Sequence, residues 1–298
     1  ADDPIVPVRL FGDRTFATAS AVVFLAVAGL FIGVVFMPRY FQLVHGASAT
    51  ESGWQIMTLL FGLIAGAVVG GLTVARTGRW KVLLLGAMAV GIVGMVMLTG
   101  LEADTELPYV WAAMFVTGLG LGPITSILTA VVQSTSPPET MGVATSSLTT
   151  FRQLGASIWL AIGGSYFTSV FDDRLPGQLR EAGVPAELAV GPTEGGGAIG
   201  SEESTVVGDL GAVILAAVPE EARAMVEPHV GAIVEGMHGA ISVATGNVFW
   251  IGIGAVAVAF MVLLPLHEVP LPKRERSRAA EGAAETDEAG EGLTVEPA

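Results

Sequence analysis

The stretch SGWQIMTLLFGLIAGAVVGGLTVARTGRWKVLLLGAMAVGIVGMVMLTG, residues 52–100, decides the fold. It consists of two apolar runs, Ser52–Ala75 and Val82–Gly100, joined by a short basic segment. An α-helix rises about 1.5 Å per residue, so about twenty apolar residues cross the roughly 30 Å hydrocarbon core of a bilayer. A lone strand would leave its backbone polar groups unpaired in lipid. We therefore predict two membrane-spanning helices joined by a tight turn.

Four further apolar runs extend this pattern along the chain. The six runs are Ala17–Met37, Ser52–Ala75, Val82–Gly100, Pro108–Val132, Met141–Val170 and Ala240–Leu266. Of the 298 residues, 52% are apolar and only 14% are charged, and the mean hydropathy is +0.66. An ordinary soluble domain has about 25% charged residues. The sequence thus predicts an all-α membrane protein with six transmembrane helices.

The six runs divide the chain into five parts. We predict a cytoplasmic lead-in over 1–16, spans one to five over 17–170, an extracytoplasmic loop over 171–239, span six over 240–266 and a disordered cytoplasmic tail over 267–298. Within the loop, segment 210–218 is too short to span and predicts a surface helix. Pro219 and the two glutamates after it predict the start of an amphipathic helix that leads into span six. Because the chain opens with Ala1 and not Met, we expect it to begin partway through a larger protein.

The charges of the short loops predict the orientation in the membrane. The segment between spans two and three carries Arg76, Arg79 and Lys81, whereas loop 101–107 carries three acids and no base. Lys and Arg concentrate in cytoplasmic loops. The bases before span one and after span six agree with this assignment. We predict a multi-pass protein of the plasma (inner) membrane with both ends of this segment in the cytoplasm.

Several classes of function are excluded by composition. Most of the net charge of −14 lies in the outer loop and the tail, and no basic stripe offers a surface to nucleic acid. The chain has no cysteine, which excludes disulfides, thiol catalysis and cysteine metal sites. The four histidines are scattered near or beyond the span ends, so we expect no metal site and no cofactor. No pair of catalytic residues lies within the spans, and we predict that the protein is not an enzyme.

The basic turn carries the most specific local pattern. It reads Gly71-Leu-Thr-Val-Ala75-Arg76-Thr-Gly78-Arg79-Trp80-Lys81. Gly78 supplies the positive φ that a tight turn needs, and cations after span two favour the negative end of its helix dipole. The stretch is similar to the Gly-x-x-x-Asp-Arg-x-Gly-Arg-Lys loop signature of the major facilitator superfamily. It departs from that signature at Ala75, which replaces Asp, and at Trp80, which replaces the second base.

Other segments extend the resemblance over nearly the whole chain, except the outer loop and tail. In order, they are Asp3–Phe11, Gly46–Gly53, Gly142–Thr145, Phe151–Gly155 and Glu268–Leu271. Together they resemble the fourteen-helix drug:proton antiporters of that superfamily, and specifically their carboxy-terminal six-helix half. The resemblance implies one bundle of two inverted three-helix repeats. It also implies a gating role for Gly71, Arg76, Gly78, Arg79 and Lys81, although these bases could instead only fix the topology.

The same resemblance implies that spans one and four line a central cavity, with Thr125 and Ser126 as substrate contacts. Arg152 lies in the cytoplasmic half of span five, where a charge is costly. Either it lines the pathway or pairs across the bundle, or its long stem carries the charge to the headgroups.

Glycines in spans two and four predict close helix packing or bending. Those of span two, Gly62, Gly66 and Gly70, recur every four residues, which lets another helix approach closely. Span four contains the hinge candidates Gly120, Gly122 and Pro123 near its middle. They form either a functional hinge or a tolerated kink.

None of the 28 acids falls inside a predicted span, although proton coupling within a membrane commonly uses buried carboxylates or histidine. If the protein is proton-driven, we expect these groups in an amino-terminal half that this chain lacks. The favoured interpretation is one half of a transporter that exports small hydrophobic or amphipathic compounds by alternating access. The alternatives are an exporter of an endogenous metabolite or lipid, and a membrane scaffold that binds a partner through its acidic outer loop.

Overall fold

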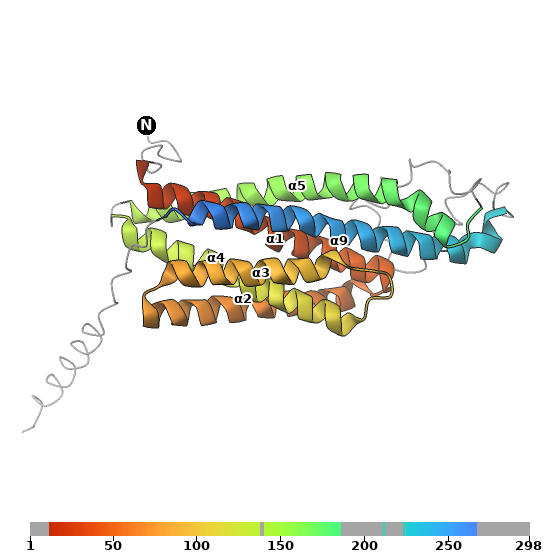
Figure 1. Cartoon of the computed structure of the whole chain (residues 1–298), viewed down its shortest axis with the longest axis horizontal. Coiled ribbons are helices and arrows are strands. Elements are labelled where there is room, and N and C mark those ends of the chain that lie inside the picture. Colours follow the sequence, from red (N-terminus) through yellow and green to blue (C-terminus); the bar gives the residue numbers. More distant parts are fainter. Residues whose placement is uncertain (1–11, 138–139, 186–210, 212–222, 224, 267–298) are drawn as a thin grey trace, which may run out of the picture.

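The computed structural model describes residues 12–137, 140–185, 211, 223 and 225–266. Its helices are α1 (Arg14–Val44), α2 (Ala49–Thr77), α3 (Trp80–Thr99), α4 (Leu107–Thr135), α5 (Met141–Glu181), the 3-10 turn η3 (Glu227–His229) and α9 (Val230–Leu263). Six of the segments are long and apolar enough to cross a membrane, which confirms the predicted fold class (Figure 1). Several predicted features lie outside the described residues: the lead-in up to residue 11, the surface helix over 210–218 except residue 211, the helix start at Pro219 and the tail 267–298.

The ends of α2 follow directly from local sequence. The Ser48 side chain accepts a hydrogen bond from the Glu51 N–H at 3.2 Å, and the Glu51 carboxylate accepts one from the Ser48 N–H at 2.8 Å. This reciprocal pair satisfies two of the backbone donors that a helix start leaves free. At the other end, Gly78 has φ of 70° and donates its N–H to the Val74 carbonyl at 2.8 Å. The predicted tight turn before α3 is therefore a glycine C-cap.

α5 and α9 are longer than the apolar runs that predicted them. α5 has 41 residues and continues beyond residue 170 to Glu181, while α9 begins at Val230. At about 1.5 Å per residue α5 is about 60 Å long, about twice the hydrocarbon core. Both helices extend past the other four, and there Leu179 and Val184 pack with Ile233 (Figure 1). Part of the segment predicted as outer loop is thus a pair of packed helix ends.

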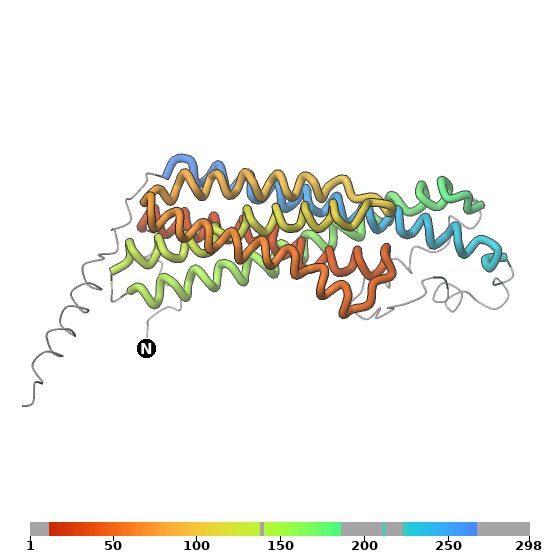
Figure 2. Tube along the Cα trace, turned by 90° about the horizontal axis from the view of Figure 1, so that it is seen from below, coloured from red at the N-terminus to blue at the C-terminus, as the bar shows by residue number. Residues whose placement is uncertain are grey.

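The bundle consists of two related three-helix units. α2 packs against α4 as α5 packs against α1, and α3 packs against α4 as α9 packs against α1. Replacing α1, α2 and α3 by α4, α5 and α9 therefore reproduces these contacts. Since successive helices reverse direction, α4 runs opposite to α1, and the second unit is inverted (Figure 1). α3 and α9 also pack against each other and run along the same edge of the bundle (Figure 2).

The two ends of the bundle differ in charge. The basic end holds the α2–α3 turn with Arg76, Arg79 and Lys81, and α1 and α5 begin there. The acidic end holds the α3–α4 loop, where Glu102 and Asp104 are exposed.

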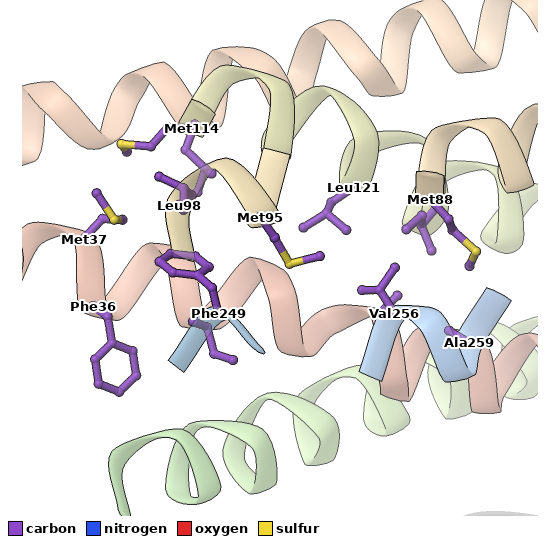
Figure 3. Close-up of a cluster of buried hydrophobic side chains, with 14 of the residues drawn as sticks. Phe36, Met37, Met88, Met95, Leu98, Met114, Leu121, Phe249, Val256 and Ala259 are labelled. Atoms are coloured by element: carbon purple, nitrogen blue, oxygen red, sulfur yellow. The ribbon is translucent and has the colours of Figure 1, made fainter. Parts of the chain in front are cut away.

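The core lies where α1, α3, α4 and α9 meet. Side chains from these helices meet in one buried apolar cluster, part of which is drawn in Figure 3. Lipid tails are as apolar as these side chains, so close packing rather than escape from water stabilises the association. Flexible methionines fill the irregular gaps between the helices. The buried residues labelled in Figure 3 are Phe36, Met37, Met88, Met95, Leu98, Met114, Leu121, Phe249, Val256 and Ala259.

Candidate functional site

The basic turn presents two of its three cations freely. Arg76 and Arg79 are exposed, and neither contacts a carboxylate in the part of the chain that the structure describes. Lys81 differs, because its Nζ donates a hydrogen bond to the Leu264 carbonyl at 2.7 Å. Leu264 is the C-cap of α9, where a cation satisfies a carbonyl and the negative end of the helix dipole. Lys81 therefore connects the start of α3 to the end of α9.

The glycines of this turn have different surroundings. Gly78 needs its left-handed conformation, which most other residues adopt only with strain. Gly71 is exposed, and a Cβ at this position would meet no atom within 4 Å. Packing therefore gives no reason for glycine at position 71. The gating role of Gly71, Arg76, Gly78, Arg79 and Lys81 stays a prediction.

The glycines of α2 form a close seam with α4. A Cβ at Gly62 would overlap the Phe115 carbonyl oxygen, and one at Gly66 would overlap the Leu119 carbonyl oxygen. At Gly70 it would lie 2.8 Å from the Cβ of Pro123. α4 also has glycines at this contact: Cβ atoms at Gly118 and Gly122 would overlap the carbonyls of Leu59 and Leu63. Backbone thus approaches backbone along this seam, as small residues allow in membranes.

The hinge candidates of α4 lie in a continuous helix. α4 runs unbroken from Leu107 to Thr135 with Pro123 inside it. Gly120 packs against the backbone of Gly91 in α3, on the side of α4 away from the α2 seam. Because proline has no N–H, the Leu119 carbonyl four residues earlier loses its helical donor, and this carbonyl is the one that faces Gly66. Packing alone accounts for these small residues, and hinge motion stays a prediction.

The predicted substrate contacts follow Pro123 toward the basic end. Thr125 is half-buried and Ser126 is exposed. The Thr125 hydroxyl lies 3.5 Å from the Gly122 carbonyl, and the Ser126 hydroxyl lies 3.2 Å from the Pro123 carbonyl. Both hydroxyls stay within reach of their own helix backbone. Neither contact distinguishes a substrate-binding role from a structural one, so the role stays a prediction.

Arg152 is half-buried beside the place where α5 crosses α1. One turn further along α5, a Cβ at Gly155 would lie 2.7 Å from the Phe24 carbonyl oxygen. Trp159 donates its indole N–H to the same carbonyl at 2.9 Å. The guanidinium of Arg152 has no hydrogen bond or ion pair with any other described residue. It lies about 16 Å from the start of α5, within reach of the headgroups at the basic end.

Two features of the acidic end were not predicted. The Tyr40 hydroxyl donates to the Glu102 carbonyl at 2.9 Å and lies 3.2 Å from His45 Nε2, which ties α1 to the α3–α4 loop. In α5, the Asp172 Oδ1 atom is shielded and has no hydrogen-bond partner among the described residues. The sequence placed Asp172 after span five because the apolar run ends before it. The position of this acid directly after an apolar run was the one sequence feature that could have indicated a shielded carboxylate.

Among the described residues, no group of three or more histidines and acids could hold a metal ion. The features described above are a membrane-spanning bundle with an inverted internal repeat, a basic glycine turn and a close glycine seam between α2 and α4. Such a bundle defines the class of multi-pass membrane transport proteins.

A family comparison makes the assignment definite. The sequence profile of the Major Facilitator Superfamily matches residues 2–160. The chain belongs to this superfamily, whose members are transporters and not enzymes. The predictions of a superfamily member, of membrane transport and of a non-enzyme are confirmed.

Three relatives show how the similarity is distributed. An uncharacterized MFS-type transporter of Mycobacterium tuberculosis is 30% identical over 267 residues, which cover 90% of this chain and 34% of that protein. Tetracenomycin C resistance and export protein of Streptomyces glaucescens is 30% identical over 87% of the chain and 45% of its own length. Multidrug resistance protein 3 of Bacillus subtilis is 30% identical over 59% of the chain and 34% of its own length. The chain thus spans between a third and a half of the length of these three relatives.

Proposed function

We propose that the chain is the carboxy-terminal half of a proton-coupled exporter of small hydrophobic or amphipathic compounds. The observation that carries the proposal is the six-helix bundle with its inverted repeat, which spans only part of its transporter relatives. Two such bundles that rock around a site between them provide alternating access. The names of the relatives, which include multidrug resistance and antibiotic export, support a hydrophobic drug-like substrate.

A polar stripe on α5 supports a partner or a water-filled pathway on that side. Ser146, Thr150, Gln153 and Ser157 are exposed and lie on one face of the helix. The three hydroxyls donate to carbonyls of their own helix. The side-chain amide of Gln153 has no hydrogen-bond partner in the described part of the chain. Polar groups within a membrane commonly face a cavity or another segment of protein, where an amide finds partners.

The basic end faces the cytoplasm in this proposal, so both termini of the segment are cytoplasmic and the membrane is the plasma (inner) membrane. The free cations of the α2–α3 turn fit this assignment. The amino-terminal half supplies the carboxylates that exchange protons. In the described part of the chain, the acids of the long helices lie toward the helix ends.

Superfamily membership favours transport over the scaffold alternative. An exporter of an endogenous metabolite or lipid shares the same fold, and only the substrate separates it from a drug exporter.

Export by the longer protein that contains this chain tests the substrate class. We expect efflux-deficient bacterial cells that produce it to accumulate less ethidium and less of several unrelated hydrophobic cations than cells with an empty vector. Abolishing the proton gradient with an uncoupler should remove the difference. Unchanged accumulation of every dye at normal membrane abundance would favour an endogenous substrate.

A further inference from the structure

A groove opens between α2 and α3 toward the basic end. Its volume is about 460 Å³, and the buried residues Gly70 and Pro123 of the α2–α4 seam contribute to its floor. Its rim is apolar and exposed, with Val69 57% and Val82 63% accessible. The two threonines in its wall, Thr73 and Thr77, donate hydrogen bonds from their hydroxyls to backbone carbonyls of α2. Their hydroxyl donors are therefore already satisfied and need no polar ligand in the groove. The groove therefore suits an apolar ligand.

The groove has the length of one membrane leaflet. On α3 its lining runs from Arg79 to Val90, and on α2 from Gly66 to Thr77. Each stretch corresponds to about 16 Å of helix, about half of the hydrocarbon core. The groove thus begins at headgroup level and ends near the middle of the bilayer, as one acyl chain of a phospholipid does.

The side chain of Arg79 lies at the headgroup end of the groove. Arg79 lines this end, and Arg76 is exposed on the same turn. Neither has a carboxylate partner in the described part of the chain, and Lys81 is engaged by Leu264. A guanidinium binds a phosphate through paired hydrogen bonds. The charge therefore complements an anionic headgroup above an apolar slot.

The groove also breaks the internal symmetry of the bundle. In the second unit, α5 and α9 correspond to α2 and α3, yet they have an extensive contact with each other, whereas α2 and α3 touch only sparsely. Gly86 contributes to the open space, since a Cβ there would meet no atom within 4 Å. A repeat unit that leaves one helix pair apart needs something to fill the gap in a membrane, because an empty apolar groove loses packing contacts.

We propose that the α2–α3 groove is a binding site for an anionic phospholipid of the leaflet at the basic end. One acyl chain lies in the groove and ends between Gly66 and Val90 near the middle of the bilayer, and the headgroup phosphate is bound by Arg79 with Arg76 nearby. The lipid completes the packing of the first three-helix unit. This inference does not depend on what the protein transports.

Photolabelling in nanodiscs tests the site. The protein that contains this chain is placed in palmitoyl-oleoyl phosphatidylcholine with a trace of phosphatidylglycerol that carries a diazirine on one acyl chain. After illumination, the labelled residues are located by peptide mass spectrometry. We expect the anionic probe to label the groove residues of α2 and α3 above the other lipid-facing surfaces, and a phosphatidylcholine probe to show no such preference.

Two variants with matched controls separate a site from bulk lipid. Gly86→Phe fills the groove, and Gly254→Phe places the same ring at an exposed glycine of α9 where a Cβ also meets no atom within 4 Å. Arg79→Gln removes the cation, and Arg14→Gln removes an exposed cation at the start of α1. Gly86→Phe should reduce groove labelling to the level of the remaining surface. Arg79→Gln should reduce it about fivefold, as expected for one juxtamembrane cation. The two controls should change nothing.

Equal labelling of all lipid-facing helices, unaffected by Gly86→Phe and Arg79→Gln, would overturn the proposal. So would an unlabelled groove, which would mean that another protein segment covers it. Labelling that an uncharged hydrophobic export substrate displaces, and that Arg79→Gln leaves intact, would assign the groove to substrate and not to lipid.

Discussion

Arg152 and Lys81 are both cations toward the basic end, but their surroundings differ. Lys81 has a defined partner, the Leu264 carbonyl at the end of α9. Arg152 has a half-buried stem and no hydrogen-bonded partner among the described residues. The sequence analysis singled out both residues, Lys81 in the gating turn and Arg152 in span five. It did not predict the Lys81 hydrogen bond or the absence of a partner for Arg152. The Lys81 bond joins residues 183 positions apart, and no local pattern indicates such a contact.

Substitution of Arg152 separates its two interpretations. If the stem carries the charge to the headgroups, Lys keeps a flexible positive side chain and Met keeps an apolar one of similar length. If the guanidinium binds a partner through its planar fork of donors, neither replacement suffices. Because the described residues offer no partner, we expect the longer protein with Arg152→Lys or Arg152→Met to export ethidium at close to the unmodified rate. Loss of export in both variants at matched membrane abundance would place Arg152 in the pathway.

Lys81→Met should weaken the contact between α3 and α9. The substitution leaves the Leu264 carbonyl without its charged donor, which at an exposed helix end costs about 1 kcal/mol. We expect a lower melting temperature in lipid nanodiscs, measured by differential scanning fluorimetry. Lys81→Arg keeps a donor and serves as the control. Equal melting temperatures for Lys81→Met and the unmodified protein would show that the bond contributes no stability.

At the scale of elements, the helices themselves were predictable and their partners were not. Apolar runs of membrane length located all six spans, because lipid forces an unpaired backbone into helices. The four-residue spacing of Gly62, Gly66 and Gly70 predicted close packing, but spacing cannot name the partner helix, which is α4. The extension of α5 was missed because helix–helix contacts near Leu179, and not hydropathy, stabilise it outside the bilayer. The part of α9 before residue 240 falls in the amphipathic helix predicted to lead into span six.

Gly66→Ala tests the seam between α2 and α4. The added methyl group would overlap the Leu119 carbonyl and push the helices apart, at a cost of about 1–3 kcal/mol. Gly53→Ala adds the same methyl group to the same helix in open space, and should be neutral or slightly stabilising. We expect a lower melting temperature and lower membrane abundance for the first variant only. If both variants behave alike, the seam is not as close as the structure shows.

At the scale of the whole molecule, the bundle has an inverted repeat and two ends of opposite charge. The repeat was implied by family resemblance and is visible in the packing of the helices. Neither the family resemblance nor the helix packing identifies the substrate. A binding site between two bundles takes residues from both bundles, and only one bundle is present here. The proposed orientation rests on the bases of the α2–α3 turn and the acids of the α3–α4 loop.

Single cysteines test this orientation, since the chain has none of its own. Thr77→Cys lies at the basic end and Ala103→Cys at the acidic end, and both positions are exposed. An impermeant maleimide added to intact cells should label Ala103→Cys and not Thr77→Cys. Permeabilised cells serve as the control, in which both cysteines should react. Labelling of Thr77→Cys from outside would reverse the orientation.

We propose that this bundle is one half of a proton-coupled exporter. The most direct test measures drug-driven proton flux across vesicles with a pH-sensitive dye, for the chain alone and for the chain produced together with the amino-terminal half. We expect no flux from the chain alone, because its described acids lie toward the helix ends, and flux when both halves are present. Robust drug-driven proton flux from vesicles that contain only this chain would contradict it.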